Sequence, residues 1–413
     1  EALSPKYHVV VANPPYMGKR SLNERLKGFV ETAFSVGKTD LYASFMIRGS
    51  TLTMPRSYFA MINMQSWMFL GSFEALRGKF LEEGTFISMA HLGERAFDSI
   101  GGAVVSTTAF IYQPAGDRTK RGTFIRLVDG QNEAKKEYCL RNCSAQANRY
   151  SVSADDLAKI PGQPLAYWVS PAVRAAFSNG EPFKDIGKPR VGMQTSNNEK
   201  YLRLWFEVGS SALGCNIEEP VWIKYIKGGP FRRWYGNLDY LLHFNTSPDY
   251  VLNQKNATLL PLDNLKRVKG TWTDLTSGKF SARQAPKASF HDISGHCFYP
   301  DEIDLNWLLG FANSSVFNEL ISVINASFHF QVGDVAKIPL LSVQRERADK
   351  YCAELIRISK SDWDAYETSW DFTTLPLLQP DHRAETLADT YTTLRTHWQG
   401  MTDEMQRLEE ENN

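Results

Sequence analysis

The first 120 residues alternate between strand-like and helix-like patterns of apolar and polar positions. Residues 9–11 form a continuous β-branched run, Val-Val-Val, which is typical of a strand buried on both faces of a parallel sheet. The same reading predicts further strands at 58–63, 86–92 and 103–112, and a helix at 73–81. This alternation predicts an α/β sheet that ends in a hairpin.

Two more helices are predicted between the first two strands. Leu22, Leu26 and Phe29 share one stripe of a helix over 21–35, with Ser21 as its N-cap. A second helix is predicted over 40–54. Asp40 stands where an N-cap belongs.

The pattern changes along the rest of the chain. Residues 121–165 are rich in charge and asparagine, which predicts a connector after a first domain at 1–120. Short strand-like stretches between Gly-rich loops, with a helix over 304–324, predict an α+β domain at 166–343. Residues 344–413 are acidic and predicted to be helical.

Composition narrows the class of protein. A chain of 413 residues with 43% hydrophobic content can form two or three domains. The longest apolar stretch, at 58–71, is too short and too polar to span a bilayer, so no membrane is expected as a partner. The five cysteines, at 139, 143, 215, 297 and 352, are odd in number and scattered, which predicts a reducing cytoplasm. Their spacing, with that of the histidines, predicts no metal site.

The tetrapeptide Asn13-Pro14-Pro15-Tyr16 directly follows the first predicted strand. Ligands of parallel sheets collect at the carboxyl ends of strands, so this loop is expected at a ligand-binding edge. The two prolines fix φ and remove N–H donors, which leaves rigid carbonyl acceptors beside the side chain of Asn13. Such acceptors suit a planar amine, because drawing on both N–H bonds makes its nitrogen a better nucleophile toward a methyl donor.

These residues resemble the catalytic motif of amino-group methyltransferases that use S-adenosylmethionine. With the segments that follow, up to about residue 358, the chain resembles adenine-N6 DNA methyltransferases of the gamma arrangement, and among them the PglX family of BREX phage-defence systems. The resemblance implies the C-terminal part of a Rossmann-like methyltransferase sheet, then an α+β target recognition domain and helices. It also implies double-stranded DNA, other BREX components and a phage DNA-mimic inhibitor as partners.

The resemblance further implies roles for single residues. Asn13 and the Pro14 carbonyl would accept hydrogen bonds from the target amine, while Tyr16 and Tyr112 would stack on the extruded base. Asn13 and Asp40 would contact the cofactor, although Asp40 is equally suited to a plain N-cap. No strand–Gly-x-Gly–helix unit precedes Asn13, so the main S-adenosylmethionine site is expected in a missing N-terminal part.

Charge is distributed unevenly although the net charge is zero. Residues 183–290 carry 16 Lys and Arg against 9 Asp and Glu, whereas residues 344–413 carry 8 against 15. The basic middle suggests a polyanion partner. Cations interleaved with aromatics predict phosphate contacts, and a polar loop predicts base contacts. The expected DNA-binding residues are Lys224, Lys227, Arg232 and Arg233 in the first group, and Gln194, Thr195 and Asn198 in the second.

Two alternatives remain open on the sequence. The tetrapeptide also occurs in methyltransferases that act on RNA or on protein glutamine, although the glutamine enzymes carry no large domain in the place of residues 166–343. The other alternative is a DNA-binding specificity module without activity.

Overall fold

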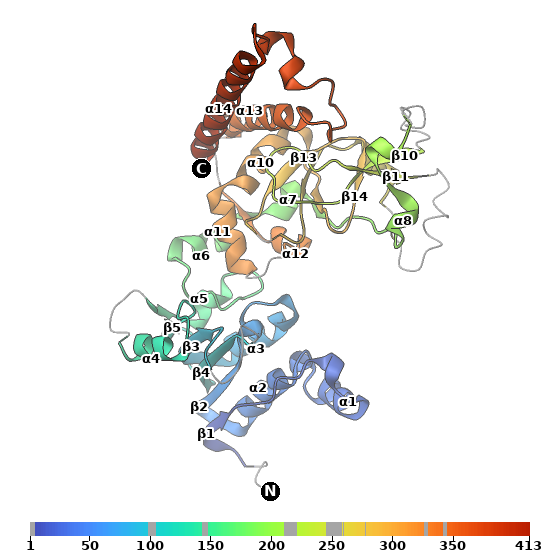
Figure 1. The fold of residues 1–413 in the computed structure, drawn as a ribbon. Coiled ribbons are helices and arrows are strands. Elements are labelled where there is room, and N and C mark those ends of the chain that lie inside the picture. The colour runs from blue at the N-terminus through green and yellow to red at the C-terminus, as the bar shows by residue number, and fades with distance from the viewer. Residues whose placement is uncertain are drawn as a thin grey trace. The chain divides into compact units, whose positions relative to one another are not determined.

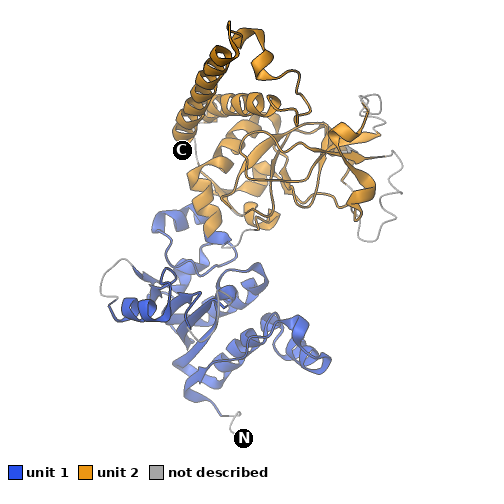
Figure 2. Cartoon of the chain, viewed as in Figure 1, with its two compact units in different colours: residues 1–179, 323–326 blue, residues 180–322, 327–413 orange. Residues whose placement is uncertain are grey.

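The computed structural model describes residues 5–97, 105–142, 148–209, 221–244, 258, 260–276, 278–325, 329–341 and 345–413. The chain divides into two compact units, residues 1–179 with 323–326 and residues 180–322 with 327–413 (Figure 2). The first two residues of the strand predicted at 103–112, together with Cys143 and Cys215, lie outside the described part.

The first unit is built on a six-stranded sheet with the order β1-β2-β4-β3-β5-β6 (Figure 1). β1 pairs in parallel with β2, and β3 with β5, while β4 runs antiparallel to both β2 and β3. Strands β1, β2, β3 and β5 therefore share one carboxyl edge. The strands are β1 (Tyr7–Ala12), β2 (Thr53–Met64), β3 (Gly84–Gly93), β4 (Thr107–Pro114), β5 (Gly122–Arg126) and β6 (Arg149–Val152).

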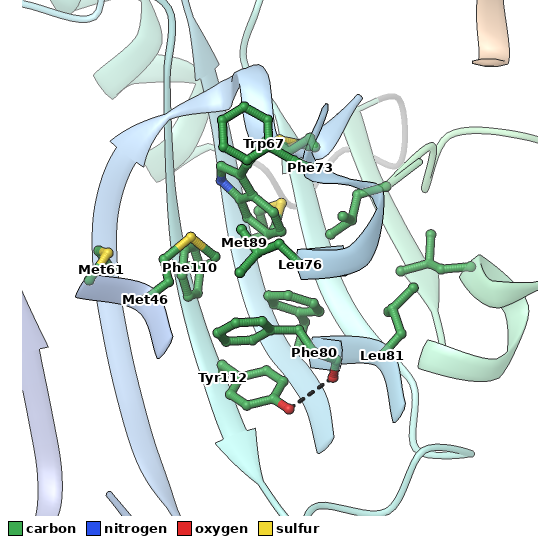
Figure 3. Packing of buried hydrophobic residues seen from close by; sticks show 14 of the residues in the cluster. Met46, Met61, Trp67, Phe73, Leu76, Phe80, Leu81, Met89, Phe110 and Tyr112 are labelled. Carbon is green, nitrogen blue, oxygen red and sulfur yellow. Dashed lines mark hydrogen bonds between the residues drawn. The ribbon is translucent and has the colours of Figure 1, made fainter. Parts of the chain in front are cut away.

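Helices pack on this sheet and enclose an aromatic-rich core. Trp67, Phe80 and Phe110 are almost completely buried there, and Figure 3 shows them with their neighbours. The helical elements of the unit are η1 (Lys19–Ser21), α1 (Glu24–Ala33), η2 (Ser35–Gly37), α2 (Leu41–Leu52), η3 (Gln65–Met68), η4 (Gly71–Phe73), α3 (Glu74–Glu83), α4 (Glu133–Arg141), α5 (Ala154–Ala158) and α6 (Pro171–Asn179).

Three expectations for this unit need correction. β1 is not buried on both faces, because Val9 and Val11, which share one face, are 59% and 73% exposed; among the described residues, β1 is also the edge strand of the sheet. The helix predicted from Ser21 starts at Glu24, and its cap is Asn23, whose side chain accepts from the Leu26 N–H. The predicted connector supplies β5 and β6, so it belongs to the same sheet.

The second unit is an α+β assembly around two four-stranded sheets, of order β14-β10-β11-β9 and β13-β12-β15-β8. Its strands are β7 (Glu181–Pro182), β8 (Pro189–Arg190), β9 (Leu202–Leu204), β10 (Trp222–Ile226), β11 (Tyr240–His243), β12 (Lys269–Trp272), β13 (Ala282–Ala285), β14 (Ser289–His291), β15 (Cys297–Phe298) and β16 (Pro339–Leu340). Its helical elements up to residue 335 are α7 (Phe183–Gly187), α8 (Asn198–Tyr201), η6 (Trp205–Glu207), η8 (Leu262–Lys266), η9 (Glu302–Asp304), α10 (Leu305–Asn313), α11 (Ser315–Ile324) and α12 (Val332–Val335).

The acidic C-terminal region is helical, as predicted, and it is part of this second unit. α13 (Arg345–Asp364) and α14 (Leu387–Asn412) are joined by a segment that contains η10 (Pro376–Leu378) and η11 (Pro380–His382). Within the described residues, no single helix has the length and apolar character to cross a membrane. The helices at 302–313 and 315–324 reach that length and apolar character only when taken together, and the pair is bent by 72°.

Candidate active site and nucleic-acid interface

The tetrapeptide Asn13-Pro14-Pro15-Tyr16 leaves the sheet at the carboxyl end of β1, as the sequence predicts. Asn13 and Pro15 are exposed, Pro14 is buried and Tyr16 is partly buried. The Tyr16 ring meets the Tyr42 ring of α2 edge to face, with centroids 6.0 Å apart. The motif therefore presents the Asn13 side chain to solvent on a loop that is anchored by Pro14 and Tyr16.

Asp40 ties this loop to the start of α2. Its Oδ1 accepts from the N–H of Met17 at 3.0 Å and from the N–H of Tyr42 at 3.2 Å. The Leu41 N–H donates back to the Met17 carbonyl at 2.9 Å. Partial burial raises the pKa of Asp40. Asp40 is thus the N-cap of α2, one of its two expected roles, and it also fixes the residue that follows the motif.

A line of polar side chains continues along the same carboxyl edge. The Tyr42 hydroxyl and Ser66 Oγ, which follows β2, are 2.8 Å apart. Gln65 directly precedes Ser66, and its Oε1 is 2.7 Å from His91 Nε2. The other ring nitrogen of His91, Nδ1, is 3.0 Å from the Tyr167 hydroxyl. Burial and the charges of Arg126 and Lys136 lower the pKa of His91 to about 3, so the ring is neutral at pH 7. The sequence reasoning missed these residues, although the polar run after the second strand was a visible signal.

Tyr112 does not lie at this edge, which corrects its expected role in base stacking. It pairs with Phe59 of β2, five residues before the carboxyl end at Met64, or roughly 17 Å along the strand. Its side chain is completely buried, and its hydroxyl donates to the Phe80 carbonyl at 2.8 Å (Figure 3). Because β4 runs antiparallel to β2, Tyr112 near the end of β4 lies away from the carboxyl edge, and its buried side chain makes it a core residue.

The polar loop expected to read bases is only partly accessible. Thr195 is completely buried, and its hydroxyl donates to Asn198 Oδ1 at 2.7 Å. The backbone of Gln194 pairs with that of Thr258. Burial excludes Thr195 from base contact, whereas Asn198 is exposed and Gln194 partly exposed.

The cations expected to meet phosphates are largely engaged within the second unit. Arg232 forms an ion pair with Asp362 at 2.6 Å, and Arg233 forms one with Glu409, also at 2.6 Å. Glu409 additionally accepts from the Trp234 indole N–H at 2.7 Å.

The two lysines of this segment lie over aromatic rings. Lys224 Nζ is 4.7 Å from the centroid of Trp370, and Lys227 Nζ is 5.6 Å from that of Tyr240. Burial lowers the pKa of Lys224. Three of the four cations thus contact the acidic C-terminal region. Lys227 instead lies over Tyr240, outside that region.

Similarity to known proteins agrees with this fold and motif. The sequence model of the Eco57I restriction-modification methylase family matches residues 2–97, which include the tetrapeptide. The structure is similar to that of the Type IIL restriction-modification enzyme MmeI in complex with DNA, with a TM-score of 0.54, 10% identity, and coverage of 94% of this chain and 53% of that one. For the Type ISP restriction-modification enzyme LlaGI with a DNA substrate mimic, the TM-score is 0.50 at 12% identity, with 92% and 44% covered. The fold is that of restriction-modification methyltransferases.

Curated relatives define the group more closely. The chain is 37% identical to the adenine-specific methyltransferase BrxX of Escherichia coli O9:H4 (strain HS), over 91% of this chain and 31% of the relative. It is 35% identical to the adenine-specific methyltransferase PglX of Lacticaseibacillus casei (strain Zhang), over 92% and 33%. The chain is a homologue of these adenine-specific methyltransferases, and it spans about a third of their length.

Proposed function

We propose that this chain supplies the target-amine side of the catalytic site and the target recognition domain of an adenine-N6 DNA methyltransferase. The observation that carries the proposal is the position of Asn13 and Pro14 at a carboxyl strand edge, on a loop held by Asp40 and Tyr42. Homology to BrxX and PglX supports DNA adenine as the substrate and a BREX system as the setting, with other BREX components as partners.

In the proposed reaction Asn13 Oδ1 and the Pro14 carbonyl accept hydrogen bonds from the two N–H groups of the adenine amine. Positive charge develops on that nitrogen as it attacks the methyl group, and fixed dipoles aimed at it stabilise the transition state. Tyr16 stacks on the extruded base, which offsets part of the cost of unpairing it. When bound, S-adenosylmethionine would supply the methyl group and leave as S-adenosylhomocysteine, and the methylated amine loses one proton to solvent.

The described residues fit the amine side of the site better than the main cofactor pocket. Cofactor sites of this type use a Gly-rich turn between a strand and a helix, next to the central strands. β1 is an edge strand here, and its Val9 and Val11 are exposed. We therefore assign to this chain the Asn13 and Asp40 border of the cofactor site, with the Gly-rich part supplied by the region that the longer relatives have in addition.

Calorimetric titrations of this chain test the proposal. We expect duplex DNA to bind, with an affinity that falls as salt rises, and S-adenosylmethionine to bind negligibly. Micromolar cofactor binding would contradict the division of the site, and no binding of duplex DNA would contradict the recognition role. Methyl transfer to duplex DNA by the full-length protein tests the reaction itself, with RNA and glutamine-containing peptides as alternative acceptors.

A further inference from the structure

Loops that are far apart in the sequence meet on one exposed surface of the second unit. Thr273 Oγ1 donates to the Gly229 carbonyl at 3.2 Å, and this contact joins the turn after β10 to the loop after β12. Leu275 in the latter loop pairs with His329, just before α12. The Phe330 N–H donates to the Asp274 carbonyl at 2.7 Å. These contacts hold the loops in one arrangement.

Asp274 organises the polar side chains of this surface. Its Oδ1 accepts from Gln331 Nε2 at 2.6 Å, and its Oδ2 lies 3.3 Å from His329 Nδ1. Behind it, His296 Nε2 is 3.5 Å from Oδ1, and His296 is only 4% exposed. The Asp274 side chain is 19% exposed, whereas that of His329 is 55% exposed and Gln331 is also exposed. A largely buried carboxylate therefore holds two outward polar side chains.

The bond to Asp274 fixes what Gln331 can offer to a ligand. A carboxylate accepts only from the amide nitrogen, so the orientation of the side-chain amide is set. Nε2 uses one of its two hydrogens for Asp274, which leaves one N–H donor beside the Oε1 acceptor. In the major groove adenine presents N7 as an acceptor and the N6 amine as a donor, whereas guanine presents two acceptors. The remaining pair on Gln331 complements adenine and not guanine.

We propose that Gln331 is a specificity-determining residue that reads an adenine of the target duplex from the major groove, at a position other than the methylated base. The proposal rests on the proposed function and gives it a substrate contact. Neighbouring loops carry groups suited to the rest of such an interface. Lys279 is exposed for a phosphate, and Leu275, which is 58% exposed, offers an apolar surface for a thymine methyl group.

The test maps N6-methyladenine by long-read sequencing in a host that expresses the full-length protein. With Gln331→Ala, one A·T position of the methylated motif should become degenerate, with discrimination there reduced by about 5- to 150-fold. The matched control is Gln399→Ala, because Gln399 Nε2 makes the same kind of bond to Asp403 Oδ1, at 2.8 Å on the exposed face of α14. The control should leave the motif unchanged. An unchanged motif in Gln331→Ala overturns the proposal.

A second measurement keeps the test decisive when methylation is lost. This chain, wild type or Gln331→Ala, selects duplexes from a random pool, and the bound DNA is sequenced. A wild-type motif that loses one A·T position in the variant supports base reading. The same motif in both proteins, or loss of binding to every duplex with an unchanged unfolding temperature, contradicts it. If this chain selects a motif but the full-length wild-type protein methylates no adenine, the proposed reaction fails and this contact does not.

Discussion

The sequence predicts a functional role for both the loop 13–17 and the segment 224–235, but in the structure their key side chains differ in accessibility. The loop keeps its key side chain, Asn13, exposed at a strand edge. The segment turns Arg232 and Arg233 toward carboxylates 130 and 176 positions further along the chain. A guanidinium binds a carboxylate or a phosphate with the same two-pronged geometry, so its local sequence does not reveal which anion it meets. Proline and β-branched residues instead restrict the conformation of their own backbone, so their effect can be predicted from the local sequence.

The largest effect should come from the loop. In the full-length protein, Asn13→Ala should lower the methylation rate at least about 100-fold, since one missing dipole at a developing charge costs about that much or more. DNA affinity should stay nearly unchanged, because the lost interaction acts in the transition state. Single-turnover methylation and duplex titration check both parts. A variant that methylates at close to the wild-type rate would show that the loop is no more catalytic than the segment.

A smaller effect is expected from the segment, and on stability. Glu409→Ala removes the acceptor of both Arg233 and Trp234, so the free energy of unfolding of the second unit should fall by about 2–3 kcal/mol. The neighbouring exposed Glu410→Ala is the control. Denaturant unfolding measures the difference, and the double variant with Arg233→Ala should show that the two losses are not additive.

The salt dependence of DNA binding sharpens the same comparison. If Arg233 is committed to Glu409, Arg233→Ala should leave the slope of log affinity against log salt unchanged. A phosphate contact would instead reduce the slope by about 0.9. The second result would return this segment to the DNA surface, as the sequence had suggested.

Acidification should weaken the two units through different histidines. The pKa of His91 in the first unit and of His291 in the second is lowered to about 3, mainly by burial. Because the unfolded chain takes up a proton near pH 6.5 while the native ring stays neutral, stability is kept above that pH and lost as pH falls from about 6.5 toward 3. Each histidine contributes a slope of up to about 1.4 kcal/mol per pH unit.

Unfolding curves between pH 7 and 5 check this expectation. His91→Asn should flatten the pH dependence of the first unit alone, and His291→Asn that of the second alone. The exposed His8→Asn is the control. Equal flattening of both units by one substitution would mean that they do not unfold independently.

The smallest effect on stability is expected at Tyr112. Tyr112→Phe removes the bond to the Phe80 carbonyl and should cost about 1 kcal/mol of stability, while methylation by the full-length protein stays unchanged. Thermal unfolding provides the measurement, with the exposed Tyr138→Phe as control. A normal stability with slower methylation would favour the base-stacking role that the fold argues against.

Local signals predicted much of the first unit. The strand at 7–12, the loop that follows it and the helix capped by Asp40 all follow from residue types within a few positions. The start of α1 was misplaced because Ser21 and Asn23 are both capping residues, and only Asn23 meets the free N–H. The resemblance assigned Tyr112 to base stacking, but the direction of its strand, which depends on pairing with β2 and β3, places it away from the carboxyl edge.

Long-range contacts account for the remaining differences. The exposure of Val9 and Val11 depends on what packs against that face of β1, which a run of valines does not specify. The neutralisation of Arg232 and Arg233 depends on helices more than a hundred residues away. The hydrogen bond from Gln331 to Asp274 joins positions 57 residues apart, and no local sequence motif predicts it.

Within the described part of the chain β1 pairs only with β2, and this edge position has a consequence for the behaviour of the chain in solution. An exposed strand with unpaired backbone groups and alternate valines is a template for pairing with another strand, and natural proteins guard such edges with charge, proline or a covering element. On β1 the side chains of Val9 and Val11 are open to solvent. Handled alone at high concentration, the chain should self-associate through this strand, and a lysine in place of Val11 should keep it monomeric.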